Sequence, residues 1–190
     1  MTLSKTLIKF CSPVFAGLKP SYLIMVKNNE YLNKEANKLK PILKKNGFRL
    51  RELGGCINVR RYLLFNEKDL EKAIHTDLNI NLLKQLNYKI TNIDDLITQL
   101  YKRIETKNLP FPHEIGIFLG YPYSDTIGFI NNKGENEKYC GYWKVYANVE
   151  QAKKNFLSFD MCKKEFCEAF ESGCPFEEII NKKFSSQLYG

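Results

Sequence analysis

Histidine and tryptophan are scarce in this sequence, which holds two histidines and one tryptophan among 190 residues. It also contains no CxxC pair, no Walker loop and no dinucleotide-binding glycine fingerprint. These absences exclude the common zinc and iron–sulfur ligand patterns and two common nucleotide sites. No apolar run approaches the roughly 20 residues needed to cross a bilayer, so we expect no membrane partner. Without repeats or low-complexity segments, the length suits one domain.

The cellular compartment is inferred from the N-terminal segment and the cysteines. Lys9 and Pro13 interrupt the first apolar run, so we read no signal peptide there. A disulfide framework is not expected in a chain that is 44% hydrophobic. The cysteines are scattered at Cys11, Cys56, Cys140, Cys162, Cys167 and Cys174. We therefore expect a cytoplasmic protein with reduced thiols.

The positive charge is concentrated in one segment. The formal net charge is +8, and Lys27–Arg51 holds eight Lys or Arg against two Glu, so it carries about +6. A basic patch of this kind can bind nucleic acid or an acidic protein, and residues 27–61 form the alternative interaction module. We do not favour nucleic acid as the partner, because surface lysines usually serve to keep a helix solvated.

Hydrophobic periodicity predicts an α/β or α+β fold, with a mixed sheet of about five strands packed against helices. The expected strands are 21–26, the hairpin 48–53 and 56–65, then 113–119 and 140–146. The expected helices are 3–10, 32–43, 67–74, 77–86, 93–104, 123–132, 149–169 and 176–183. We expect a single α/β domain over residues 1–160, with a C-terminal helical extension over 161–190 packed on it.

The hairpin carries an arginine-rich face. A tight turn at Gly54-Gly55 would place Arg49 opposite Arg60 and Arg51 opposite Asn58. Like charges directly opposite one another are unfavourable, so this face must be solvated or compensated by an anion. We favour solvation.

Four motifs resemble those of an uncharacterised bacterial domain-of-unknown-function family. They are CSPVFAGLK (11–19), FPHEIGIFLGYP (111–122), GFINNKG (128–134) and CGYWKVY (140–146). The resemblance spans roughly Leu7 to Phe159 and implies no established activity. The family's first motif is closer to CAPTLAG, so Ser12, Val14 and Phe15 depart from it. The reactive residues within the matching motifs are Cys11, Lys19, His113, Glu114, Cys140 and Lys144.

Cys11 is a candidate nucleophile. If Pro13 starts a helix, Cys11 lies just before its N-terminus, where the helix dipole lowers a thiol pKa. The competing interpretation, which we rank first, is a small apolar residue in a packed turn.

Strand alternation over 140–146 places a mixed set of side chains on one face. Cys140, Tyr142, Lys144 and Tyr146 share that face, while Trp143 and Val145 lie on the other. The first face can bind an aromatic or anionic ligand, with Lys144 supplying charge. In the equally weighted alternative the tyrosines pack against helices and Lys144 reaches solvent.

The motif at 111–122 supplies the remaining candidates. His113 can transfer protons near neutrality, and Glu114 shares a strand face with two glycines that leave space beside it. The Gly120-Tyr121 turn leads into a helix whose N-terminus can hold a phosphate or carboxylate, although Asp125 opposes an anion there. The strand interior is expected to be core.

These residues predict a small-molecule-binding domain with thiol or imidazole chemistry, and leave open whether it is an enzyme. The candidate catalytic residues are Cys11, His113 and Glu114. The candidate ligand-binding residues are Lys19, Gly120, Tyr121, Cys140, Tyr142 and Lys144. The ligand and any cofactor stay unidentified. A structural metal-binding protein is an alternative that would use Cys11, His113, Glu114 and Cys140, although their spacing assigns no metal ligands.

Overall fold

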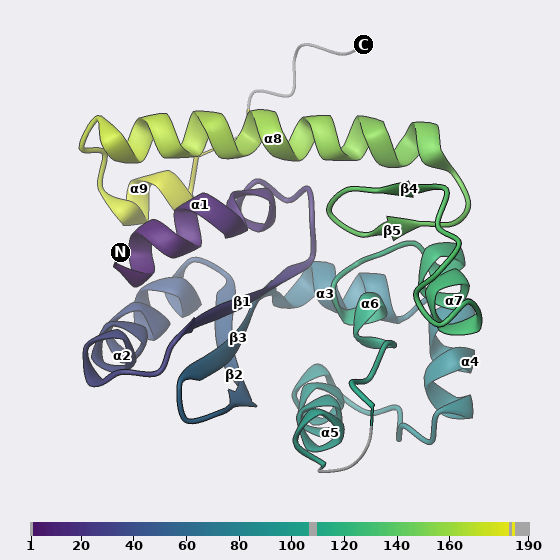
Figure 1. The fold of residues 1–190 in the computed structure, drawn as a ribbon. Coiled ribbons are helices and arrows are strands. Elements are labelled where there is room, and N and C mark those ends of the chain that lie inside the picture. Colours follow the sequence, from purple (N-terminus) through teal and green to yellow (C-terminus); the bar gives the residue numbers. More distant parts are fainter. Residues whose placement is uncertain (1, 107–109, 183, 185–190) are drawn as a thin grey trace.

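The structure is a computed structural model that describes residues 2–106, 110–182 and 184. These residues form nine helices and five strands in an α+β arrangement (Figure 1). The strands are β1 (Ser21–Lys27), β2 (Phe48–Gly55), β3 (Val59–Asn66), β4 (Tyr139–Cys140) and β5 (Lys144–Val145). The helices are α1 (Leu3–Phe15), α2 (Glu30–Lys45), α3 (Glu67–Ile74), α4 (Asp77–Gln85), α5 (Ile93–Glu105), α6 (Ile115–Phe118), α7 (Tyr123–Asn131), α8 (Val149–Glu171) and α9 (Phe176–Ile180). None of the described helices is both long and apolar enough to cross a membrane.

The strands form two separate antiparallel sheets, so the expectation of one mixed sheet is wrong. The larger sheet has the order β1-β3-β2, and the smaller pairs β4 with β5. The smaller sheet lies between α7 and α8, away from the larger one (Figure 1). With only two residues in each strand, it extends no ladder toward the larger sheet.

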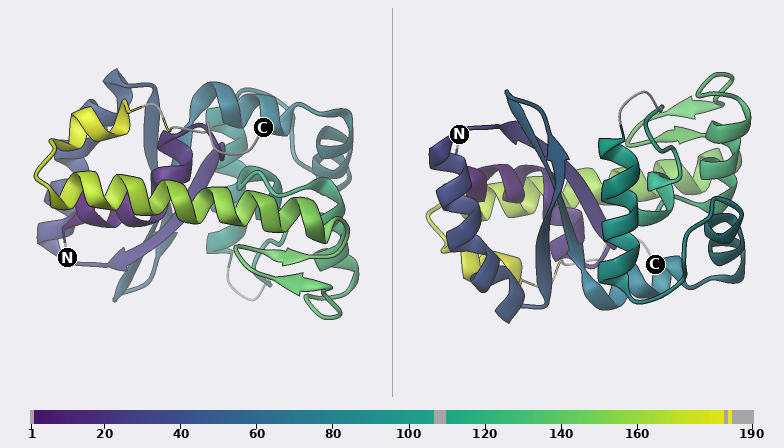
Figure 2. Two further views of the ribbon diagram at one scale, coloured as in Figure 1. Left: turned by 90° about the horizontal axis from the view of Figure 1, so that it is seen from above. Right: turned by 90° about the horizontal axis from the view of Figure 1, so that it is seen from below.

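Both faces of the larger sheet are buried, because its central strand alternates between two cores. Leu64 of β3 joins a core formed with α1, α2, α8 and α9. Leu63 and Phe65, its chain neighbours, join a second core formed with α3, α4, α5 and α6. Views from above and below show the sheet between these two helical layers (Figure 2).

The long helix α8 connects two of the cores. Its N-terminal half supplies Phe156 and Phe159 to a third core, which includes Trp143 of the hairpin turn. Its C-terminal half supplies Cys162 and Phe166 to the core around α1. The helix continues through residue 160 without a break. One continuous helix therefore packs against both the β4–β5 hairpin and α1 (Figure 1).

Most predicted helices are confirmed, and their capping residues explain where they begin. Asn66, Thr76, Asn92 and Asn148 each accept a hydrogen bond from a backbone N–H in the first turn of the following helix. The predicted final helix is shorter than expected, because α9 ends at Ile180; Lys183 lies outside the described residues.

The expected break at Pro13 is wrong, because α1 continues through it to Phe15. The turn comes after the helix, where the N–H groups of Leu18 and Lys19 both donate to the Pro13 carbonyl. Cys11 consequently lies inside α1, near its C-terminal end. The helix dipole opposes a thiolate at that end, so the premise for an activated Cys11 fails.

The predicted register of the hairpin formed by β2 and β3 is also wrong. The β2 register shifts between Glu52 and Gly55, which pairs with Arg60, and the turn uses Cys56, Ile57 and Asn58 instead. Arg49 therefore pairs with Phe65 rather than Arg60. The longer turn shifts every cross-strand partner.

The arginines of this sheet meet the chain's own carboxylates. Arg49 pairs with Glu67 at 3.2 Å and with Asp94 at 2.7 Å. Arg60 pairs with Glu52, and Arg61 with Glu105. Internal ion pairs thus compensate these arginines, where we expected solvation.

The predicted strand at 113–119 is a helical turn followed by α6. The N–H groups of Ile115, Gly116 and Ile117 donate to carbonyls three residues earlier. Short apolar runs do not distinguish a buried strand from a buried helix. Here local backbone hydrogen bonds form helical turns at both ends of the run. The Ser21 hydroxyl donates to the Phe118 carbonyl at 2.5 Å and fixes the turn against β1.

The predicted strand at 140–146 is a hairpin that reverses at Gly141–Trp143. The Gly141 N–H donates to the Trp143 carbonyl at 3.1 Å, which closes the turn. A Cβ at residue 141 would lie 2.3 Å from the Phe156 ring, so only glycine fits here. The expected single face of Cys140, Tyr142, Lys144 and Tyr146 is therefore wrong.

Candidate functional site

A cavity of about 510 Å³ lies between α6, α7 and the β4–β5 hairpin. Its apolar and aromatic walls are Leu23, Phe111, Ile115, Leu119, Tyr121, Phe129 and Trp143. Its polar walls are His113, Asp125, Thr126, Cys140, Tyr142 and Lys144, and two glycines complete it. Cavities that hold small molecules commonly measure about 300–1,000 Å³ and combine apolar walls with a few polar groups.

Gly120 positions the aromatic wall. Its φ of +69° turns the chain after α6, and a Cβ there would lie 2.4 Å from Pro20. The turn at Gly120 sets the position of Tyr121, whose ring stacks on Trp143 with the ring centroids 5.0 Å apart. The role of Gly120 is thus to shape the backbone, and Tyr121 borders the cavity as predicted.

Asp125 ties the hairpin to α7. Its buried carboxylate accepts from the Trp143 indole N–H at 2.8 Å, and from the backbone N–H groups of Tyr146 and Ala147 at 2.8 and 3.0 Å. Its oxygens are therefore engaged within the chain. Sequence reasoning treated Asp125 only as an acid in a first helical turn. Its contact with Trp143, which follows 18 residues later, cannot be read from the local sequence.

Thr126 supplies an unpartnered polar atom. The residue is 3% exposed, and its Oγ1 has no hydrogen-bond partner among the described residues. It borders the cavity directly beside Gly116, where a Cβ would lie 2.7 Å from that oxygen. Buried hydroxyls rarely lack a partner, so this one is an unusual feature of the cavity wall. Sequence reasoning did not identify Thr126.

His113 and Cys140 border the cavity from exposed positions. The His113 ring lies 4.9 Å from the Phe129 ring, centroid to centroid. Cys140 lies on β4, at the opposite wall. These two predicted residues meet the same cavity, although no hydrogen bond joins them in the described structure.

Lys144 is engaged rather than free. Its Nζ donates to the Gly134 carbonyl at 2.6 Å and pairs with Glu137 at 3.0 Å. The hydrogen bond to Glu137 raises the pKa of Lys144. Tyr142 donates from its hydroxyl to Asp160 at 2.5 Å. Both residues border the cavity with their charges and polar ends already satisfied.

Glu114 lies apart from this cavity. It is 4% exposed and accepts from Arg103 Nε at 2.6 Å and from the Tyr88 hydroxyl at 3.0 Å. Burial and then the charge of Glu114 raise the pKa of Tyr88. This network joins the α6 turn to α5, and the expected glycine-made space is filled by Thr126 and Tyr121.

Cys11 is fully buried in the core around α1. Burial raises the pKa of its thiol, and the nearby positive charges of Lys163 and Lys19 offset only part of that effect. The thiol therefore stays protonated near neutrality. Cys11 makes no hydrogen bond to His113 or Glu114 in the described part of the chain.

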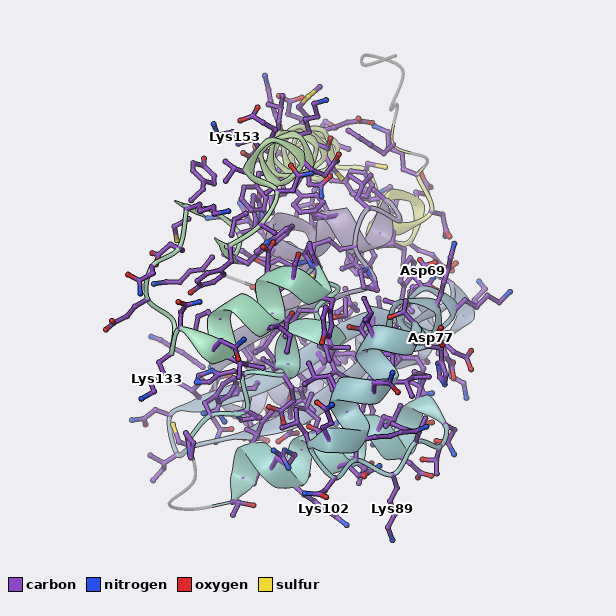
Figure 3. The ribbon with its side chains drawn as sticks, turned by 90° about the vertical axis from the view of Figure 1, so that its right-hand side faces the viewer. Asp69, Asp77, Lys89, Lys102, Lys133 and Lys153 are labelled. Carbon is purple, nitrogen blue, oxygen red and sulfur yellow. The ribbon has the colours of Figure 1, made fainter. Side chains whose placement is uncertain are left out.

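Lys19 is buried at 5% exposure, which is unusual for a lysine. By contrast, Lys89, Lys102, Lys133 and Lys153 project outward from the surface (Figure 3). Aromatic rings surround the Lys19 Nζ. Lys19 is near enough to Cys11 for their charges to interact, and it contacts Tyr121 and Trp143, which border the same cavity as His113.

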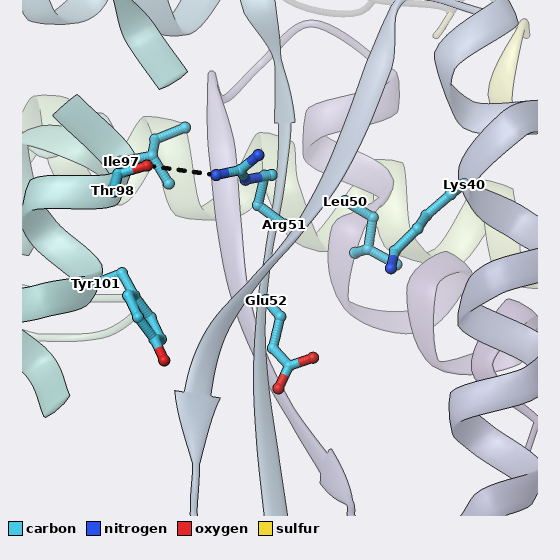
Figure 4. A pocket seen from close by; sticks show the side chains of 7 residues that line it. All are labelled: Lys40, Leu50, Arg51, Glu52, Ile97, Thr98 and Tyr101. Atoms are coloured by element: carbon cyan, nitrogen blue, oxygen red, sulfur yellow. Dashed lines mark hydrogen bonds between the residues drawn. The ribbon is translucent and has the colours of Figure 1, made fainter. Parts of the chain in front are cut away.

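A second hollow, of about 570 Å³, lies between α2, β2 and α5 (Figure 4). Arg51 extends across it to Thr98, with 3.4 Å between the guanidinium nitrogen and Oγ1. Glu52 on the same strand pairs with Arg60. Arg51 and Glu52 are thus engaged by Thr98 and Arg60, and none of the described polar side chains that line this hollow is buried.

The described residues hold no group of three or more His, Cys, Asp or Glu that could bind a metal ion. In particular, Cys11 is enclosed in a core while Cys140 is exposed on the hairpin. The set that sequence reasoning considered for a metal is therefore not assembled in these parts of the chain.

A family model described as "Protein of unknown function (DUF3793)" matches residues 7–180. The chain belongs to this family. The match runs past Phe159, where the motif resemblance ended, and includes α8 and α9. No curated protein and no solved structure matches the chain.

Proposed function

We propose that this DUF3793 protein binds a small, mainly apolar molecule in the cavity between α6, α7 and the β4–β5 hairpin. The buried, unpartnered Thr126 hydroxyl carries this proposal, because it offers one hydrogen bond inside walls that are otherwise largely apolar. A guest with a single polar group would satisfy it.

The state of the charged wall residues favours a neutral guest. Asp125 already accepts three hydrogen bonds, and Lys144 already pairs with Glu137. A charged ligand would have to displace one of these contacts, at the cost of leaving a group unpaired. The stacked rings of Tyr121 and Trp143 suit a flat molecule.

His113 and Cys140 are the reactive groups that the proposal retains from the sequence. Both border the cavity from accessible positions, so an imidazole and a thiol are available to a bound molecule. Cys11 and Glu114 have no part in the proposed site, because one is enclosed in a core and the other is paired with Arg103.

The lone tryptophan makes the proposal testable, since Trp143 borders the cavity and its emission reports on that site. Prodan, a neutral and flat naphthalene dye, is titrated into the full chain while Trp143 quenching and the dye's blue shift are followed. We expect saturable binding of one dye per chain. Thr126→Val removes the hydroxyl and should weaken prodan binding about fivefold to tenfold, because one hydrogen bond is lost.

Steric obstruction supplies a second arm with a matched control. Cys140→Phe places a large ring at the cavity wall and should reduce prodan affinity by about tenfold or more. Cys56→Phe makes the same change at an exposed position in the β2–β3 turn and should leave affinity unchanged. Equal affinity in all these variants would contradict the proposal.

A further inference from the structure

The amine of Lys19 sits in an aromatic cage without a counter-ion. Its Nζ lies 5.3 Å from the Tyr22 ring centroid, 4.8 Å from Tyr121, 5.7 Å from Trp143 and 5.8 Å from Phe159. These rings come from β1, the α6–α7 connection, the hairpin and α8. No carboxylate pairs with this amine in the described residues, and nothing there hydrogen-bonds to it.

A second cation lies beside the cage. Lys163 of α8 places its Nζ 5.7 Å from the Tyr22 ring centroid, so the two lysines share that ring. Burial and the charge of Lys163 lower the pKa of Lys19 to about 7, while Cys11 opposes the shift. Burial and the Lys163 charge thus favour the uncharged amine, against the cation–π stabilisation that the rings give to the ammonium. Desolvation and a neighbouring cation are the two devices that activate lysine as a nucleophile.

The cage adjoins the cavity of the proposed function. Tyr121 and Trp143 border the cavity, and both rings also contact the amine of Lys19. One aromatic layer thus separates the amine from a guest. A molecule in the cavity can therefore reach the amine only if the Tyr121 ring, which is partly buried, moves aside.

We propose that Lys19 is a nucleophile that forms an imine with an aldehyde or ketone bound in this cavity. The inference rests on the proposed function and names its ligand class. The amine nitrogen attacks the carbonyl carbon, and one amine proton passes to the carbonyl oxygen to give a carbinolamine. The hydroxyl then leaves with the second amine proton as water, and the C=N bond forms. No oxidant or reductant is required.

A carbonyl compound fits the site better than a carboxylate. A carboxylate needs the charged form of Lys19, which burial and Lys163 both disfavour. A neutral carbonyl compound also fits cavity walls whose own charges are already paired. The carbonyl carbon is the electrophile with which an uncharged amine reacts to release only water.

Reductive trapping tests this proposal on the full chain. Naphthaldehyde at equimolar concentration is added near pH 7 with cyanoborohydride, which converts an imine into a stable secondary amine, and peptide mass spectrometry locates the product. We expect labelling of Lys19 to be at least about tenfold faster than labelling of the exposed Lys34 and Lys153. Labelling of Lys19 at or below the surface rate would overturn the inference.

Three variants sharpen the result. Cys140→Phe should slow labelling of Lys19 and leave Lys34 unaffected, because the aldehyde must enter the cavity. Lys163→Met should move the midpoint of the pH–rate curve above about 7 by removing the neighbouring cation. Lys19→Met should abolish the fast product while Trp143 quenching by naphthaldehyde persists. Fast labelling that ignores Cys140→Phe would overturn the link to the cavity.

The two proposals fail in different ways. If naphthaldehyde quenches Trp143 saturably but Lys19 is not labelled, the cavity binds and the imine inference falls. If naphthoate binds more tightly than naphthaldehyde and this binding is lost in Lys19→Met, the amine serves as a cation for a carboxylate and the inference also falls. If neither compound quenches Trp143 and Lys19 is unlabelled, both proposals fall.

Discussion

Tyr121 and Trp143 stack with their ring centroids 5.0 Å apart, and the same two rings contact both the cavity and the amine of Lys19. They come from segments separated by more than twenty residues. The Asp125 carboxylate accepts a hydrogen bond from the Trp143 indole N–H. The backbone turn at Gly120 sets the position of Tyr121. The geometry of the candidate site therefore depends on these two supports.

Gly120→Ala tests the support of Tyr121. At φ +69° any side chain is strained, and the new Cβ would also overlap Pro20. Gly17→Ala is the matched control, because its φ is +72° and no atom lies within 4 Å of the new Cβ. Urea unfolding should show Gly120→Ala destabilised by about 1–3 kcal/mol more than the control. Equal losses would mean that Pro20 yields and that Gly120 contributes only its backbone freedom.

Asp125→Asn tests the support of Trp143. The amide oxygen can still accept from the Tyr146 and Ala147 N–H groups, but the amide NH2 then faces the Trp143 indole N–H, so we expect a loss of about 2 kcal/mol in unfolding free energy. Trp143 emission should change, because its indole loses a charged partner. Asp77→Asn alters an exposed acid in the first turn of α4 and should cost no more than about 0.5 kcal/mol. A similar small loss at both positions would count against the role of Asp125.

The lowered pKa of Lys19 predicts a pH-dependent stability. The folded state binds fewer protons than the unfolded state between pH 7 and the ordinary lysine pKa, so stability rises with pH across that window. Below the folded-state pKa of Lys19 the buried amine is protonated, and this contribution to the stability is then fully lost. From about pH 6.5 to about pH 8 the gain should be about 1 kcal/mol.

Lys19→Met should remove this gain, whereas Lys34→Met, at an exposed surface lysine, should retain it. Urea unfolding at the two pH values measures the effect. The range stops at about pH 8 because unfolded thiols begin to ionise above it. An unchanged slope in Lys19→Met would show that another group titrates.

Thiol accessibility separates the cysteines of the core from those of the cavity. Cys56 and Cys140 are exposed, and Cys11 and Cys162 are buried. Burial raises the pKa of Cys162 to about 12, so its thiolate is scarce as well as inaccessible. Iodoacetamide should label the exposed pair in the folded protein and the buried pair only on unfolding. Prodan should protect Cys140 and leave Cys56 unprotected; rapid labelling of folded Cys11 would contradict the structure.

Sequence patterns predicted the helices well where the patterns are long and capped. Asn92 and Asn148 begin α5 and α8 as their capping role predicts, because a side-chain acceptor and the following apolar stripe act within a few residues. The prediction failed at short apolar runs. Residues 114–119 are all buried, so burial imposed no alternation that could separate a strand from a helical turn.

Of the residues named from the sequence, His113, Tyr121, Cys140, Tyr142 and Lys144 border one cavity. That they bind a ligand there stays a prediction. Thr126 was missed because its significance is a lack of partners, which a sequence does not display. Glu114 was taken as a site residue because its partner Arg103 is chosen by the fold.

The sequence by itself determined the capped helices, the absence of a common metal or nucleotide motif, and the resemblance to a family that matches residues 7–180. These properties depend on residues that are close along the chain. The tertiary structure decided which lysine is buried among aromatic rings, which threonine lacks a partner and which carboxylate holds the tryptophan. Burial and contacts between distant segments set the pKa of Lys19 and the shape of the cavity, and neither is a property of local sequence.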